Sequence, residues 1–465
     1  MRNQTLTEDQ RFPLLTEDGR QLLRWLQEHP NAPRYNYACG DQLTRESLER
    51  VRAYEAELQA AKKGWSHGQL PAWVTGYAEI CLREAPFYRR RGGSAEDFFS
   101  IPTTDRADLI REPWSFVPDR QPLDEMIVYD SSGTTGRPLL VPSHPEVSSK
   151  YLPALRAALS RHNVALEGGK NRVSILTVCA QNSTLTYASI SSFLDGAAYV
   201  KINLNPADWR DNGDRARFID SCDAEIYSGD PISFAALMKL RLATRPKALV
   251  SSAMTLLPGL KRQLEAHFNC PVIDVYSLCE SRFIAARAGD EFEIIPHDLY
   301  VEILAADGRV CASGERGEIT ITGGRNPFQP LLRYRTDDYA AMEFHGQTPV
   351  LVNFEGRQPT LFVDARGKII NNINVTHALK SFPIAQFSLH QFEDRALLLR
   401  MRGIGVDYQK VKAALLDLFG ARQTLVIEEL ADRNAREGKV IQYTSDIKDI
   451  NIEQAEFSFG RATTP

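Results

Sequence analysis

The stretch Tyr129-Asp130-Ser131-Ser132-Gly133-Thr134-Thr135-Gly136-Arg137-Pro138 decides the fold. It follows an apolar run typical of a strand, Met126-Ile127-Val128, and it combines hydroxyl side chains with two glycines. Gly133 and Gly136 permit positive φ angles and close approach, so the turn can direct several N–H and hydroxyl donors at one ligand group. A phosphate suits such a turn. Clusters of Ser, Thr and Gly also form ordinary loops, and the Gly-Lys-Ser/Thr of the nucleoside-triphosphatase P-loop does not follow here.

Working outward, the chain after Pro145 alternates between helical and strand-like patterns. We expect helices over 151–162, 184–194, 215–219 and 234–242. A further helix is expected where Leu260, Leu264 and Phe268 recur at every fourth position. We expect strands over 172–178, 198–202, 224–227, 248–250 and 271–276. Such alternation predicts an α/β fold with a mostly parallel sheet and helices on both faces. Ligands of such folds bind at the carboxyl ends of the strands.

Two residues with suitable chemistry follow the last of these strands. The ring of Tyr276 offers a stacking surface for a purine, and Glu280 offers a hard oxygen ligand suited to Mg²⁺. A purely structural role for both residues is also compatible with their spacing. Further along, Asp338 in the run Arg333-Tyr334-Arg335-Thr336-Asp337-Asp338 can accept both hydroxyls of a ribose, although such a run can also form a surface ion-pair network.

The run S-S-G-T-T-G-R-P resembles the phosphate loop of the adenylate-forming superfamily, which contains acyl-CoA synthetases, luciferases and peptide-synthetase adenylation domains. The doubled serine resembles the phenylacetate-CoA ligase branch in particular. The resemblance implies that one loop holds the phosphates of ATP, with Thr135 in a catalytic role as well. The residues of this loop are Ser131, Ser132, Gly133, Thr134, Thr135 and Gly136.

Two further segments are similar to motifs of the same superfamily. Residues 276–280 resemble Y-[GS]-x-[ST]-E, which implies that Tyr276 lies against adenine and that Glu280 holds the metal. Residues 333–338 resemble R-Y-R-T-G-D, which implies that Asp338 binds the ribose. Cys279 stands where the family has Ser or Thr, and Asp337 stands where Gly is usual.

The C-terminal part supplies two more resemblances. Gly356-Arg357 is similar to the interdomain hinge, and this implies that Arg357 reaches the nucleotide. The acidic residue expected shortly after it is replaced by Pro359-Thr360, which puts the rotation of the small domain in question. Glu437-Gly438-Lys439 resembles the catalytic lysine segment of the ligase branch, so Lys439 is expected at the α-phosphate and the substrate carboxylate, although a Lys in such a loop is often only exposed charge.

The segment before the phosphate loop also resembles the ligase branch, through P-F-Y-R and P-x-T-x-x-D-L. We expect residues 86–91 to form a loop and residues 101–109 to contain a capped helix start. The three arginines from Arg89 to Arg91 are interpreted as scaffold. Upstream, Thr44 is expected to cap a helix with Leu48, Val51, Tyr54 and Leu58 on one face, which Gly64 could end.

The predicted domains follow from these segments. A helical N-terminal extension covers 1–85, a large adenylate-forming domain covers 86–356, and a small α/β lid covers 357–448. Within the lid we expect a strand pair around Glu393-Asp394, a helix over 407–419 and a strand over 424–427. The tail over 449–465 has little apolar content and is expected to be disordered.

Composition restricts the class of partner. The 465 residues carry a net charge of −4, which disfavours nucleic acid. The seven cysteines are scattered and odd in number, a pattern typical of reduced thiols in a cytosolic protein. No apolar run approaches the roughly 18 residues of a membrane span, and no signal region begins the chain, so we expect a cytoplasmic protein without a membrane partner.

Together these segments imply an ATP- and Mg²⁺-dependent ligase that converts a carboxylic acid, by the branch resemblance an aryl acid, into an acyl-adenylate. Coenzyme A is the default acceptor of the acyl group. An amine or carrier-protein thiol in a biosynthetic pathway, such as that of an antibiotic, is the alternative, and a nucleotide-binding relative without catalysis is a second one. The resemblance includes a homodimer as one possibility. Candidates for the acid pocket are Tyr187, the residues 251–254 and Arg282, each of which could equally be core or surface.

Overall fold

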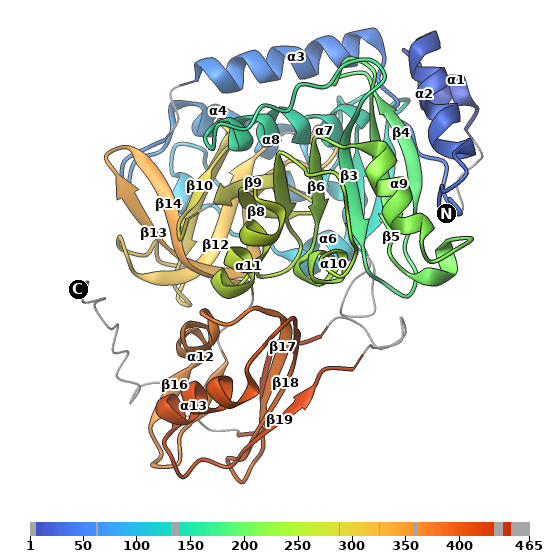
Figure 1. Cartoon of the computed structure of the whole chain (residues 1–465). Helices are drawn as coiled ribbons and strands as arrows, with labels where there is room; N and C mark the ends of the chain where they lie inside the picture. Colours follow the sequence, from blue (N-terminus) through green and yellow to red (C-terminus); the bar gives the residue numbers. More distant parts are fainter. Residues whose placement is uncertain are drawn as a thin grey trace. The chain divides into compact units, whose positions relative to one another are not determined.

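The protein is described here from a computed structural model (Figure 1). The residues that it describes are 6–61, 64–131, 139–287, 289–324, 326–356, 360–431 and 440–447. The chain divides into two compact units. Unit 1 comprises Met1–Leu256 and Lys261–Gln358, and unit 2 comprises Leu257–Leu260 and Pro359–Pro465. A large α/β unit and a separate small α/β unit confirm the predicted fold class.

The chain begins with helices that carry much of the first hundred residues. They are α1 (Glu8–Arg11), α2 (Glu17–Glu28), α3 (Arg45–Ala60), α4 (Ala72–Glu84), α5 (Pro86–Arg91) and α6 (Arg106–Arg111). As predicted, Thr44 caps α3, because its hydroxyl accepts a hydrogen bond from the backbone N–H of Ser47 at 3.2 Å. Helix α3 ends at Ala60, however, ahead of Gly64. Its buried face places Val51, Tyr54 and Leu58 against the core of unit 1.

The prediction of a loop over 86–91 is wrong, because these residues form helix α5. Pro86 occupies the first helical position, where its fixed φ angle favours a helix and its missing N–H costs nothing. The capped helix start that follows is confirmed. The Asp105 carboxylate accepts a hydrogen bond from the N–H of Asp108, and the backbone N–H of Asp105 donates one to the Asp108 carboxylate, a capping box that begins α6. A short 3₁₀ helix, Phe98–Ser100, lies between α5 and α6, and a second one, Pro113–Phe116, follows α6.

A mixed sheet of twelve described strands forms the centre of unit 1, in the order β11-β12-β13-β14-β10-β9-β8-β7-β6-β3-β5-β4. In chain order its strands are β3 (Val173–Cys179), β4 (Tyr187–Ser191), β5 (Ala197–Asn203), β6 (Ile226–Gly229), β7 (Ala248–Ser251), β8 (Val272–Leu278), β9 (Arg282–Arg287), β10 (Phe292–Ile294), β11 (Leu299–Leu304), β12 (Arg316–Gly323), β13 (Leu331–His345) and β14 (Thr348–Glu355).

The expected parallel arrangement holds for β5, β3, β6, β7 and β8. The remaining pairs are antiparallel, because strands from β8 to β14 follow one another through short connections that contain no described helix. The helices of the parallel part are α7 (Pro145–Ser149), α8 (Tyr151–Ser160), α9 (Asp214–Cys222), α10 (Pro231–Leu237) and α11 (Pro258–Phe268), with a 3₁₀ turn at Pro206–Asp208. One core cluster joins α3 and α8 to β3, β6, β7 and β8.

The predicted helix over 184–194 is wrong, because this segment contains β4, which pairs antiparallel with β5 at one end of the sheet (Figure 1). Tyr187 and Ile190 are typical strand formers, and pairing with β5 satisfies the backbone of the segment. Helix α2 contacts β4, and the segment after α2 bonds the residue just before the strand. Asn36 accepts the N–H of Thr186 at 2.8 Å and donates its own backbone N–H to the carbonyl of Thr186 at 3.2 Å.

Unit 2 is a small α/β unit. Its elements are β15 (Leu361–Val363), β16 (Ile369–Asn371), α12 (Asn372–Leu379), β17 (Ile384–Gln391), β18 (Leu397–Gly403), α13 (Tyr408–Phe419), β19 (Leu425–Glu429) and β20 (Tyr443–Ser445). The strand pair around Glu393-Asp394 is β17 and β18, and the helix predicted over 407–419 is α13, which Asp407 caps. Val411, Leu415 and Phe419 of α13 pack into a core with Phe387 and Leu399.

Candidate active site

The predicted phosphate loop lies at the tip of a two-stranded hairpin. Strand β1 (Ile127–Ser131) pairs antiparallel with β2 (Leu139–Ser143), and Ser131 is opposite Leu139 at the last described position. The hairpin therefore brings the two ends of the loop together. Most of the loop lies outside the described residues, namely Ser132, Gly133, Thr134, Thr135 and Gly136, and of Ser131 only the backbone is described. The roles proposed for them stay predictions.

Tyr276 and Asp338, which the sequence predicts at the two ends of a nucleoside, are in direct contact. The Tyr276 hydroxyl donates a hydrogen bond to the Asp338 carboxylate at 2.9 Å. Burial, together with the negative charge of Asp338, raises the pKa of Tyr276 well above its usual value, so the phenol keeps its proton. The ring of Tyr276 lies 4.6 Å from that of Phe354 on β14. Its placement against adenine stays a prediction.

This contact shows that the sheet curls. Strand β8, which carries Tyr276, and strand β13, which carries Asp338, are four positions apart in the sheet order. In a flat sheet that separation would be about 19 Å. A bond of 2.9 Å is possible only because the antiparallel strands fold back toward the end of β8. Residues distant in the sheet order therefore meet at one site.

Glu280 is hydrogen-bonded to Tyr334, a residue for which the sequence predicts no role. It lies in the turn after β8, it is 5% exposed, and its Oε1 accepts a hydrogen bond from the Tyr334 hydroxyl at 2.5 Å. Burial and the charge of Glu280 raise the pKa of Tyr334 well above its usual value. Tyr334 and Asp338 both belong to β13. This one strand therefore supplies the partner of Glu280 and the partner of Tyr276.

The departure at Asp337 fits the local backbone. Asp337 has a φ angle of 61°, in the left-handed region that Gly adopts freely and that Asp tolerates better than most residues. The register of β13 against β12 shifts here, between the pairs Thr320 with Arg335 and Glu318 with Tyr339. The Asp337 N–H donates to Glu318 at 3.1 Å. This bulge directs Asp338 toward Tyr276.

The segment before the hairpin supports β13 from outside the sheet. The guanidinium of Arg333 is 4% exposed, forms an ion pair with Glu302 at 2.7 Å, and donates to the carbonyl of Ile101 at 2.8 Å. Thr104 donates its backbone N–H to the carbonyl of Arg333 at 3.0 Å. The arginines of α5 are paired with carboxylates, Arg89 with Asp119 and Arg91 with Asp108, as scaffold residues would be.

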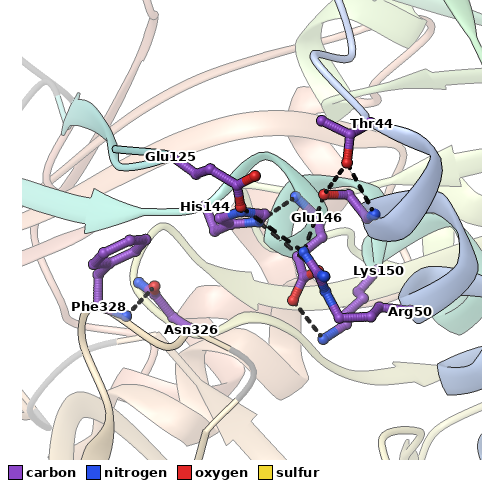
Figure 2. Close-up of polar contacts among 9 residues, drawn as sticks. Thr44, Arg50, Glu125, His144, Glu146, Lys150, Asn326 and Phe328 are labelled. Atoms are coloured by element: carbon purple, nitrogen blue, oxygen red, sulfur yellow. Dashed lines mark hydrogen bonds and ion pairs between the residues drawn. The ribbon is translucent and has the colours of Figure 1, made fainter. Parts of the chain in front are cut away.

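Figure 2 shows a buried histidine at the base of the same hairpin. His144 follows β2, and its Nε2 lies 2.6 Å from a carboxylate oxygen of Glu125, which precedes β1. Its Nδ1 accepts the backbone N–H of Glu146 at 3.2 Å, so the proton is assigned to Nε2. The ring stacks on Phe328. With both nitrogens occupied, His144 has no lone pair for base catalysis and instead joins the two strands of the hairpin.

The same network reaches the N-terminal helix α3 (Figure 2). Nε of Arg50 donates to Glu146 at 2.6 Å, and Lys150 donates to the other carboxylate oxygen at 3.3 Å. Burial opposes the ionisation of Glu146, but the positive charges of Lys150 and Arg50 outweigh it, and the pKa of Glu146 is lowered. Helix α3 therefore holds the base of the loop hairpin through a charge network.

Magnesium is compatible with the donor set. Among the described residues no three His, Cys, Asp or Glu side chains gather as a metal cluster. Mg²⁺ bound with a nucleotide needs only one or two carboxylates, because phosphate oxygens and waters complete its shell. Glu280 fits that requirement, since a carboxylate that accepts one hydrogen bond from Tyr334 keeps further lone pairs.

Other predicted residues lie elsewhere. Arg357 and Lys439 are outside the described residues, as is Pro359 of the hinge. Tyr187 is on β4, five strands from β8, which corresponds to roughly 24 Å across the parallel part of the sheet. The structure therefore does not bring Tyr187 to this site. A cleft of about 690 Å³ is also present in unit 1, lined among others by Trp65, Trp73 and His297, and none of the predicted site residues lines it.

Two general expectations can be checked. The seven cysteines form no disulfide bond with one another. In the described part of the chain, no helix combines the length and the apolar character needed to cross a membrane.

A curled α/β sheet in a large unit, followed by a small α/β unit, is the fold of acid-CoA ligases. A structure of 2-hydroxyisobutyryl-CoA ligase in the postadenylation state, in complex with R3-HIB-AMP, is similar with a TM-score of 0.57 and 17% identity, over 86% of this chain and 90% of that one. The same ligase in complex with 2-HIB-AMP gives a TM-score of 0.56 and 17% identity over the same shares. At this identity the likeness shows the fold alone.

Sequence comparison adds little. No known family profile matches the chain. Protein CapK of Staphylococcus aureus is 27% identical over 152 residues, which are 30% of this chain and 32% of CapK. The chain thus matches about a third of the length of that relative.

Proposed function

We propose that the protein is an ATP-dependent ligase that converts a carboxylic acid into an acyl-adenylate with release of pyrophosphate. The observation that carries the proposal is the pairing of Tyr276 with Asp338 and of Tyr334 with Glu280 at the end of β8. These pairs place a ring and two carboxylates together, within a fold shared with an adenylate-bound acid-CoA ligase.

In the proposed reaction, a carboxylate oxygen of the acid attacks the α-phosphorus of ATP, and the bond from that phosphorus to the pyrophosphate oxygen breaks. The protein contributes position and charge rather than a covalent intermediate. Tyr276 lies against the adenine, Asp338 and Arg357 fix the ribose, and the loop from Ser131 to Gly136 holds the phosphates. Mg²⁺, when bound, neutralises phosphate charge. Lys439 neutralises the charge that develops at the carboxylate and the α-phosphate.

The Tyr334–Glu280 contact gives one of these roles a physical basis. A buried carboxylate is costly unless it is hydrogen-bonded, and the Tyr334 hydroxyl supplies one bond while keeping its own proton. The bond holds the Glu280 side chain in place, where it can bind a cation that arrives with the nucleotide. Asp338 is fixed in the same manner by Tyr276.

After adenylation, the acyl group must pass to an acceptor. Coenzyme A is the proposed acceptor, and an aryl acid is the proposed substrate. An amine or a carrier-protein thiol is the alternative acceptor. Coenzyme A accelerates turnover only if it is the acceptor, so one assay distinguishes the two cases. Pyrophosphate release is measured with Mg-ATP across a panel of aryl, fatty and amino acids, with and without coenzyme A.

Acid-dependent release would support adenylation, and acceleration by coenzyme A would support thioester formation. Release that ignores coenzyme A would favour the amine or carrier acceptor. ATP binding without release for any acid would favour a nucleotide-binding protein without catalysis.

The residue roles have their own test. Exchange of pyrophosphate into ATP is expected to collapse in Glu280→Ala and to fall in Lys439→Ala, each by about 100-fold or more, because charge stabilisation of this kind is worth several kcal/mol. An exposed arginine on α3, changed in Arg52→Gln, serves as the matched control. Rates like that of the control in both variants would contradict the assignment.

A further inference from the structure

Arg282 has an unusual backbone conformation for its place in the chain. It is the first residue of β9, two residues after Glu280, and it pairs with Leu278 at the end of β8. Its φ angle is 63°, in the left-handed region that a long side chain rarely adopts. Such a strained conformation is found often at binding and catalytic sites, where the surrounding structure must hold it. The backbone conformation at Arg282 therefore sets the direction of its side chain.

The guanidinium of Arg282 lies beside the phosphate-loop hairpin. Its central carbon is 4.5 Å from the ring centroid of Tyr129, which belongs to β1 and precedes Ser131 by two residues. The Tyr129 hydroxyl is in turn hydrogen-bonded to Ser148 at 2.7 Å. A cation over an aromatic face is held in orientation without using its N–H donors. Arg282 is thus fixed between the loop hairpin and the Glu280 turn with donors to spare.

Among the described residues, the charge of Arg282 has no anionic partner. Its Nη2 is buried and makes no hydrogen bond with any of them. The neighbouring Ser281 is 7% exposed, and its buried Oγ also has no hydrogen-bond partner there. Arg287, at the other end of the same strand, is by contrast paired with Asp274 at 2.9 Å. A buried guanidinium nitrogen without a hydrogen-bond partner is unfavourable, so a ligand oxygen that accepts from Nη2 would relieve the cost.

We infer that Arg282, assisted by Ser281, binds an anionic group of the ligand at this site. The class of ligand rests on the proposed function, which supplies two sources of anionic oxygens. One is a phosphoryl group of ATP, and the other is a second carboxylate on the acid. A planar guanidinium matches both groups with two parallel N–H donors.

The test measures binding, so it does not depend on turnover. Arg282→Gln removes the charge, and Arg282→Gly removes the side chain while accepting the positive φ angle without strain. Arg52→Gln, which removes an exposed cation paired with Asp195, is the matched control. Calorimetry with each protein uses Mg-ATP, pyrophosphate and two pairs of acids, benzoate with isophthalate and propionate with succinate.

Both variants are expected to bind at least one of these anions about tenfold more weakly than the wild type and the control. A loss for Mg-ATP and pyrophosphate assigns Arg282 to a phosphoryl group. A loss confined to isophthalate or succinate assigns it to a second carboxylate of the substrate. Unchanged affinity for every probe that the wild type binds would overturn the inference. Failure of the proposed function would show differently, as wild-type protein that binds ATP and releases no pyrophosphate with any acid.

Discussion

The hydroxyl of Tyr334 is the smallest feature on which the candidate site depends. It joins the middle of β13 to the turn after β8 through Glu280, which is buried. A phenylalanine ring would fill the same space without donating a hydrogen bond to the Glu280 carboxylate. The arrangement of the site therefore depends on one oxygen atom as well as on the packing of the ring.

Removing that oxygen should destabilise the protein. In Tyr334→Phe, Glu280 loses its donor while remaining buried, and we expect the free energy of unfolding to fall by about 1–3 kcal/mol. Urea unfolding followed by circular dichroism measures the change. Tyr408→Phe, at an exposed position, is the control. Equal stability of the two variants would show that the Tyr334–Glu280 bond contributes nothing net.

Asp337 allows a test of the backbone alone, since it is exposed and has a φ angle of 61°. We expect Asp337→Gly to change the free energy of unfolding by less than about 0.5 kcal/mol, because relief of strain is offset by the entropy that Gly adds to the unfolded chain. Asp337→Val should destabilise by about 1–2 kcal/mol, because a branched side chain is disfavoured in the left-handed region. Thermal unfolding of both variants would distinguish them. A tolerated valine would mean that the bulge in β13 can rearrange.

At the scale of elements, helix α3 and the loop hairpin act as one assembly. Arg50 of α3 contacts Glu146, and His144 beside it contacts Glu125 on the other side of the hairpin. Two strands alone are marginally stable in water. The network gives the hairpin a fixed base, which the proposed binding of phosphates at defined positions would require.

This network predicts a dependence on pH. The pKa of Glu146 is lowered from 4.5, so its ionised form stabilises the fold above that pH, and the contribution disappears as the pH falls through the folded-state pKa. We expect Glu146→Gln to be less stable than the wild type by about 1–3 kcal/mol at pH 7. The difference should shrink at pH values below 4.5. Urea unfolding at several pH values tests both statements, and a gap independent of pH would refute the electrostatic explanation.

At the scale of the whole molecule, nucleotide binding should appear as global stabilisation. A ligand that binds only the folded state at 100 times its Kd adds about 2.7 kcal/mol. We expect Mg-ATP to raise the Tm of the wild type and to raise that of Asp338→Asn much less, because the amide lacks the charge and the second acceptor that a ribose uses. Differential scanning fluorimetry provides the comparison. Equal shifts would remove Asp338 from the nucleotide site.

Much of the fold was accessible from the sequence, because its signals are local. The caps at Thr44 and Asp105 are short-range hydrogen-bond patterns, and both begin helices as expected. The segments over 86–91 and 184–194 were mispredicted for different reasons. Pro86 reads as a loop residue unless it occupies the first turn of a helix, and β4 acquires its conformation from pairing with β5.

The candidate site was accessible only in part. Tyr276, Glu280 and Asp338 were predicted from motifs, and the structure brings them together. Tyr334 was quoted without a role, because its partner depends on the curl of the sheet between β8 and β13, which no local pattern encodes. The partnerless state of Arg282 was likewise not accessible, since it depends on which carboxylates the fold places nearby.

The contact between the N-terminal segment and β4 has a consequence for how the protein is handled. An uncovered strand at the end of a sheet offers its free N–H and carbonyl groups to other chains, and it is a frequent origin of aggregation. Helix α2 contacts β4, and Asn36 and Tyr37 bond Thr186, the residue just before the strand. A shortened form lacking residues before Arg45 should therefore sediment as large assemblies rather than as a discrete species, even where every residue of the candidate site is retained.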